Sequence, residues 1–118
     1  MLSEQSQRLY SLEYGIVFAN RSTKEAESFS QDKTRSSLDI DRELVLALVK
    51  CIEIIGEAAT RISNESREGL PQIPWSNIIG MRNRLIHAYF DINLDILWKT
   101  VIEDLPPLIS KLEEIIEV

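Results

Sequence analysis

The sequence predicts an all-α protein, an up-and-down bundle of four or five helices. Apolar residues recur at helical spacing along most of the chain. No segment shows sustained two-residue alternation with β-branched enrichment, and glycine-rich phosphate loops are absent. Pro71 and Pro74 separate two of the periodic segments, and the pair Pro106 and Pro107 interrupts the last one.

Length and composition indicate one globular domain over residues 1–118. No apolar run is long enough to span a bilayer, and the N-terminus lacks the features of a secretory signal, so a cytoplasmic location without membrane contact is expected. A formal charge of −6 argues against non-specific coating of nucleic acid, and no DNA partner is expected. A local basic patch that handles one phosphate remains compatible with that charge.

The N-terminal half predicts two helices joined by a polar connection. Ile16 and Ala19 belong to an amphipathic helix over about residues 4–22. Residues 22–37 are rich in Ser, Lys and Glu and predict a short helix followed by a mobile loop. The strongest helix spans about residues 40–66 and should form the central core. Its apolar stripe consists of Leu44, Leu48, Ile52, Ile55, Ala59 and Ile62, widened by Val45, Val49 and Ala58. The single cysteine, Cys51, fits a small buried hydrophobe.

The C-terminal half predicts two further helices. Residues 68–74 stop the long helix and start the next, which runs from about Pro74 to Tyr89. Asn93 is a plausible N-cap for the last helix. Pro106 and Pro107 should kink or break that helix, while its apolar face continues to the end of the chain.

The helix predicted over 74–89 carries the chain's only histidine, His87. Arg82 falls in the middle of its apolar stripe, and a guanidinium in such a position needs an ion-pair partner, a cleft or a second subunit. Glu53 and Glu57 lie near the stripe of the central helix, and Glu57 could hold this arginine. The stripe around Arg82 consists of Trp75, Ile78, Ile79, Leu85, Ile86 and Tyr89.

Five residues separate Arg82 from His87, which on an ideal helix places the side chains roughly 140° apart. They could converge if the helix ends or bends near His87. They could also converge if two copies of the helix pack across a two-fold axis. We favour the second explanation.

A histidine and an arginine together suit metal-free RNA cleavage. A base removes the proton of the ribose 2′-hydroxyl, the oxygen attacks phosphorus, and a cation offsets the developing charge, leaving a 2′,3′-cyclic phosphate. One histidine without a nearby carboxylate motif does not predict a metal site, and no cofactor is expected. No serine elbow accompanies His87 to form a nucleophilic triad.

Structural alternatives exist for each of these residues. His87 could cap a helix or lie as a satisfied buried ring, and Arg82 could form a structural ion pair with Glu57 or Glu53. Tyr89 could be a core aromatic with its hydroxyl at the rim.

Arg82, His87 and Tyr89 form the pattern Arg-x-x-x-x-His-x-Tyr, which resembles the signature of the HEPN superfamily. The surrounding sequence is similar to that of its HepT branch. The similarity covers the chain from about Leu38 onward. The matching segments are 52–59, 73–75, 78–87, 97–98 and 103–106.

The resemblance implies a HEPN fold, a homodimer with facing motif helices, and a metal-independent endoribonuclease that acts as a type II toxin. Arg82 and His87 inherit the catalytic roles, with Asn83 and Arg84 as auxiliary residues. The implied partner is a minimal nucleotidyltransferase antitoxin that attaches AMP to Tyr89. A bulky phosphodiester two residues from His87 would occupy the place where the RNA phosphate binds.

Two other functions stay open from the sequence. The protein could be a non-catalytic helical partner that regulates a nucleotidyltransferase, or a plain dimerisation bundle. Growth arrest on expression alone would favour the nuclease. The class of RNA that is cut is not predicted.

Overall fold

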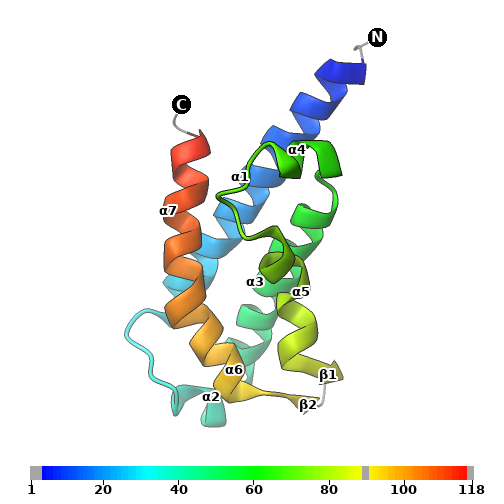
Figure 1. Cartoon of the computed structure of the whole chain (residues 1–118). Helices are drawn as coiled ribbons and strands as arrows, with labels where there is room; N and C mark the ends of the chain where they lie inside the picture. Colours follow the sequence, from blue (N-terminus) through cyan, green and yellow to red (C-terminus); the bar gives the residue numbers. More distant parts are fainter. Residues whose placement is uncertain (1–3, 89–90, 117–118) are drawn as a thin grey trace.

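The computed structural model describes residues 4–88 and 91–116, with side chains described for residues 14–85 and 91–116. Figure 1 shows successive long helices running in opposite directions, as the predicted bundle requires. The long helices are α1 (Glu4–Ser30), α3 (Arg42–Thr60), α5 (Trp75–Leu85) and α7 (Leu105–Ile116). The shorter ones are α2 (Ser37–Ile40), α4 (Asn64–Glu68) and α6 (Leu94–Lys99).

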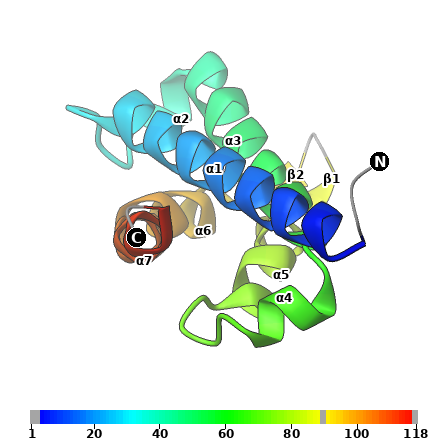
Figure 2. The ribbon, with the colours of Figure 1, turned by 90° about the horizontal axis from the view of Figure 1, so that it is seen from above.

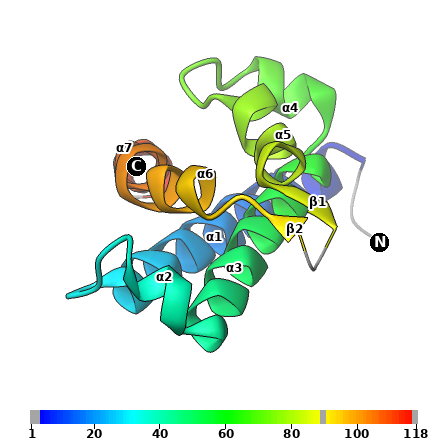
Figure 3. The ribbon, with the colours of Figure 1, turned by 90° about the horizontal axis from the view of Figure 1, so that it is seen from below.

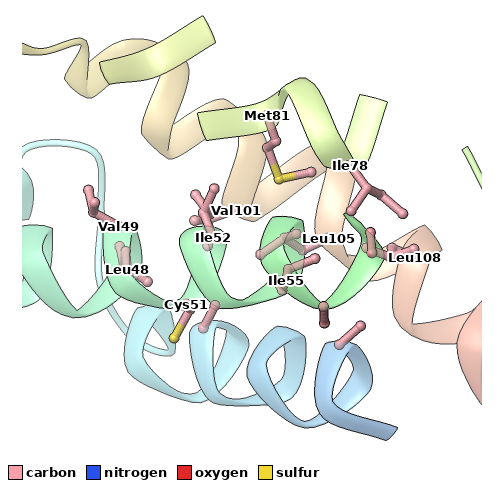
Figure 4. Close-up of a cluster of buried hydrophobic side chains, with 14 of the residues drawn as sticks. Leu48, Val49, Cys51, Ile52, Ile55, Ile78, Met81, Val101, Leu105 and Leu108 are labelled. Carbon is pink, nitrogen blue, oxygen red and sulfur yellow. The ribbon is translucent and has the colours of Figure 1, made fainter. Parts of the chain in front are cut away.

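Helix α3 is the centre of the fold, as predicted. It packs against α1 and α5, and α1 also packs against α7. Figure 2 shows α1 lying across α3, with α7 and the pair of α4 and α5 both below α1 in this view. The members of the predicted α3 stripe are all buried. Figure 4 shows Leu48, Ile52 and Ile55 of α3 facing side chains from α5 and the C-terminal helices.

Cys51 is confirmed as a small buried hydrophobe. Its side chain lies between α3 and α1 and is 4% exposed (Figure 4). Burial raises the pKa of the Cys51 thiol to about 11, with a further contribution from the negative charge of Glu25. The thiol is therefore protonated at neutral pH and lacks the thiolate character of a reactive cysteine.

Helix α1 is longer than the predicted 4–22 and takes in much of the polar segment 22–37. The buried Thr23 hydroxyl donates to the carbonyl of Ala19 (2.6 Å), and the Ser30 hydroxyl donates to the carbonyl of Glu27 (3.0 Å). Because these hydroxyls are satisfied inside their own helix, they can face the core. The helix stops just before Asp32, which adopts the left-handed conformation with φ 61°.

Helix α3 is shorter than the predicted 40–66. It begins after Asp41, whose carboxylate accepts a hydrogen bond from the Leu44 amide (3.0 Å). It ends at Thr60, and Ser63 then adopts an extended conformation and caps α4 by accepting from the Ser66 amide (3.1 Å). A serine that caps a new helix therefore divides the predicted long one.

The last helix begins as predicted, because the Asn93 side chain accepts a hydrogen bond from the Ile96 amide (3.0 Å). The proline pair does not break it. Instead, α6 leads into α7 through a π-helical segment (Thr100–Asp104), in which the Leu105 amide donates to the Thr100 carbonyl. The wider turn places Pro106 and Pro107 in the first turn of α7, where a missing amide hydrogen is tolerated.

A short two-stranded ribbon was not predicted. Strand β1 (Ile86–Ala88) pairs antiparallel with β2 (Asp91–Ile92), and Ile86 lies opposite Ile92. Figure 3 shows the ribbon at the end of α5, where α6 begins. Strands of two or three residues are too short to produce an alternating pattern, and the mostly helical structure agrees with the all-α class. No helix in residues 4–88 or 91–116 is long and apolar enough to cross a membrane.

Candidate functional site

The helix that carries the arginine motif ends earlier than predicted, at Leu85 instead of Tyr89. In a longer helix, the Leu85 carbonyl would accept from the amide four residues on. It accepts instead from the Asn93 amide (2.8 Å), which belongs to the start of α6. Arg82, Asn83 and Arg84 therefore lie in the last turn of α5, and the backbone of His87 lies in β1.

The end of α5 changes the geometry of the proposed catalytic pair. The angle of roughly 140° applied to one unbroken helix, and the helix ends between Arg82 and His87. This corresponds to the first of the two explanations that the sequence allowed. The His87 side chain and all of Tyr89 lie outside the described residues. The two-fold arrangement that we favoured stays a prediction.

Arg82 forms one of the ion pairs considered from the sequence. Its Nε donates to Oε1 of Glu53 on α3 (3.3 Å). The side chain of Glu53 is 18% exposed and that of Arg82 is 41% exposed, so the pair is partly shielded from water. A carboxylate that accepts a hydrogen bond from Nε restricts the rotation of the guanidinium. It thereby also fixes the direction of the two Nη groups.

Glu57, proposed from the sequence as the orienting carboxylate, makes a different ion pair. Its Oε1 accepts from Nη2 of Arg61 (2.8 Å), and both side chains are exposed. The glutamate that the structure pairs with Arg82 is therefore Glu53. Glu57 lies one helical turn further along α3, on the same side of the helix.

A cleft of about 290 Å³ opens between α3 and α5 around this ion pair. Both Arg82 and Asn83 line it, so the structure brings these two predicted site residues together. Arg84 is exposed and does not line the cleft, and its Nη2 donates back to the Asn77 carbonyl (3.0 Å). The lining residues are Glu53, Gly56, Glu57, Thr60, Ile79, Arg82 and Asn83.

The α3 wall of the cleft was only partly recognised in the sequence. Glu53 and Glu57 were singled out, whereas Gly56 and Thr60 were not. The four positions follow the spacing i, i+3, i+4, i+7, which places them on one side of a helix and could have revealed the whole wall. A Cβ added at Gly56 would lie 3.4 Å from the Ile78 carbonyl, which is an ordinary van der Waals contact.

Electrostatically, the cleft combines one guanidinium with two carboxylates and neutral polar groups. The Glu53 carboxylate is already engaged with Arg82, and that of Glu57 with Arg61. Within the described part of the chain, no three or more His, Cys, Asp or Glu side chains gather where they could hold a metal ion. The Arg82 guanidinium, oriented by Glu53 and next to Asn83, is the group in this cleft that can bind an anion.

Comparisons with known proteins show the family of the chain. The family model described as "Ribonuclease HepT-like" matches residues 19–115, and so extends into α1 beyond the similarity recognised from the sequence. A protein of Thermococcus cleftensis named "Probable ribonuclease HepT" is 39% identical over 75% of this chain and 81% of its own length. A protein of Methanocaldococcus jannaschii, named as a "Putative RNase", is 37% identical over 78% of this chain and 84% of its own length. No solved structure was found to match the chain.

The family match over residues 19–115 includes both helices that form the cleft, α3 and α5. The names of these relatives describe ribonucleases. The chain belongs to the Ribonuclease HepT-like family.

Proposed function

We propose that the protein is a metal-independent endoribonuclease, with Arg82 and His87 as its catalytic pair. One observation carries the proposal: Arg82 lines a cleft, is oriented by Glu53, and lies in the last turn before the strand that holds His87. The ribonuclease names of the relatives support the same activity.

The proposed reaction is a transesterification. His87 takes the proton of the ribose 2′-hydroxyl, and the 2′-oxygen forms a bond to the adjacent phosphorus. The bond from phosphorus to the 5′-oxygen of the next nucleotide breaks, and that oxygen receives a proton. Arg82 stabilises the negative charge that develops on the phosphoryl oxygens. The products are a 2′,3′-cyclic phosphate and a free 5′-hydroxyl.

RNA cleavage in EDTA tests this proposal. Wild-type protein free of any antitoxin should yield cyclic-phosphate ends, whereas folded His87→Ala and Arg82→Ala proteins should lose at least about 100-fold in rate. Arg84→Ala is the matched control, because that arginine lies outside the cleft and should lose much less activity. No cleavage of several RNA classes, by protein whose Tyr89 is shown by mass spectrometry to be unmodified, would favour the regulatory partner of a nucleotidyltransferase.

The proposal includes regulation as a type II toxin. A minimal nucleotidyltransferase antitoxin would attach AMP to Tyr89 and so add negative charge next to His87. RNA phosphate and the attached AMP would then compete for the same cleft. The resemblance to HepT proteins supports this part of the proposal.

We also propose that the active form is a homodimer. Tyr14, Val17 and Phe18 on α1 are 49%, 49% and 44% exposed, which is unusual for large apolar side chains on one helical turn. Tyr14 and Phe18 line a groove of about 420 Å³ between α1 and α3, together with Ile54 and the oppositely charged Glu57 and Arg61.

This groove suits a second copy of the chain, although such an interface differs from the one that the resemblance implies, in which the two motif helices face each other. A two-fold axis would place the aromatic rings of one copy in the groove of the other, and Glu57 of one copy opposite Arg61 of the other. Glu57 lines both this groove and the cleft, so a second copy bound in the groove would lie at the edge of the cleft.

A further inference from the structure

A second groove lies next to the cleft, between α4 and α5. Its volume is about 360 Å³. Ile79 lines both the groove and the cleft, so the two are neighbours along α5. The groove is lined by Asn64, Arg67 and Glu68 from α4 and by Trp75, Ser76 and Ile79 from α5.

The groove and the cleft share one face of α5. At 100° per residue, the five α5 residues that line them fall within an arc of about 120°. Seven residues separate Trp75 from Arg82, which corresponds to roughly 10 Å along the helix axis. A ligand that is anchored at Arg82 and extends along this face therefore reaches Trp75. The five residues are Trp75, Ser76, Ile79, Arg82 and Asn83.

Trp75 is held in a fixed position at the groove. Its indole Nε1 donates to the carbonyl oxygens of Arg67 and Leu70, both at 3.0 Å. The residue is only partly buried and lines the groove. A fixed, partly exposed aromatic ring can stack against an unpaired base with little loss of conformational freedom.

The charge of this region differs from that of the whole chain. From Arg61 to Ala88 the sequence holds four arginines and two glutamates, although the chain carries a net charge of −6. Arg67 lines the groove, and its Nη2 donates to Oδ1 of Asn64. Glu68 also lines the groove, so one arginine and one glutamate balance in its lining, and Arg67 is the group there that can contact a phosphate.

We propose that this groove, which we name the α4–α5 groove, binds a flanking nucleotide of single-stranded RNA whose scissile phosphate lies at Arg82. The base stacks on Trp75, and Arg67 contacts the backbone phosphate. The inference rests on the ribonuclease function proposed above. Single-stranded RNA is specified because a base must be unpaired to stack on a protein side chain.

RNA binding by catalytically inactive His87→Ala protein tests the groove without requiring cleavage. In this background, Arg67→Gln should weaken the binding of a labelled hexanucleotide by about three- to tenfold and reduce the slope of log K against log salt by about one. The matched control is Arg21→Gln, which removes an exposed arginine of α1 that is paired with Glu25 and lines neither the cleft nor the α4–α5 groove. The control should change neither quantity.

A crosslinking experiment needs no substitution in the groove. A hexanucleotide with one photoreactive uridine, moved through the sequence, should crosslink to Trp75 from one flanking position. Unchanged affinity and salt slope for Arg67→Gln, with crosslinks only outside residues 64–79, would overturn the inference. If the wild type still cleaves RNA in that case, the proposed ribonuclease function stands and only the groove proposal fails. If RNA binds through the groove but is not cleaved, the proposed ribonuclease function fails and the RNA-binding groove stands.

Discussion

At the scale of single residues, the ion pair between Arg82 and Glu53 is the central feature of the site. The sequence had offered two glutamates one helical turn apart as partners of this arginine. Which of them faces Arg82 depends on the register between α3 and α5, which no local pattern in either helix reveals. The structure pairs Arg82 with Glu53, whereas Glu57 pairs with Arg61.

Substitution of the two glutamates distinguishes their roles. Glu53→Gln should lower kcat/KM for RNA about tenfold, because a misoriented guanidinium stabilises the transition state poorly. The partly exposed ion pair should contribute less than about 1 kcal/mol to the free energy of unfolding. Steady-state cleavage and thermal unfolding measure the two effects.

Glu57→Gln is the comparison for this prediction, since it makes the same chemical change one turn away and breaks an exposed pair. Its loss of activity should be smaller than that of Glu53→Gln. A larger loss for Glu57→Gln would return the orienting role to Glu57.

At the scale of the elements, the prediction from sequence depended on how strongly each segment was periodic. The apolar stripe of α3 was predicted correctly because a face this wide must be covered by neighbouring helices, which makes α3 a central helix. The continuation of α1 to Ser30 was predicted only as a separate short helix, because buried polar residues such as Thr23 interrupt the apolar stripe while satisfying their hydrogen bonds within the helix. The β1–β2 ribbon was missed because its formation depends on pairing between segments, including the bond from Asn93 to Leu85.

The contact between α1 and α3 gives a glycine prediction. Gly15 lies in α1, and a Cβ there would lie 2.7 Å from Cγ1 of the buried Ile62 and 3.3 Å from the Ala58 carbonyl. Gly15→Ala should therefore lower the free energy of unfolding by about 1 kcal/mol, since overpacking outweighs the better helix propensity of alanine. Chemical denaturation measures this change.

The control for Gly15→Ala is the same substitution at Gly80, within α5, where the nearest atom to an added Cβ is Nη1 of Arg84 at 3.6 Å. Gly80→Ala should raise the free energy of unfolding by about 0.5–1 kcal/mol. Stabilisation by both substitutions would show that α1 and α3 separate easily.

At the scale of the whole molecule, the exposed aromatic face of α1 predicts self-association. Phe18→Glu should convert the proposed dimer to a monomer, because the substitution places a charge in an apolar interface beside Glu57. Light scattering and sedimentation velocity at several protein concentrations measure the state.

Phe29 offers a matched control on the same helix, since it is 43% exposed and does not line the groove. Phe29→Glu should leave the dimer intact. A monomeric wild type, or a Phe18→Glu protein that remains dimeric, would contradict the proposed interface.

Arg82 and His87 lie on structural elements of different stability, and this difference affects how the site responds to heat and denaturant. Arg82 belongs to a helix anchored in the core by Ile78, Met81 and Leu85. His87 belongs to a ribbon of a few residues, and such ribbons open at a lower free energy than core helices do. Opening of the ribbon alone would separate the proposed catalytic pair while the bundle stays folded, so we expect activity to be lost at a lower temperature than that at which the bundle unfolds.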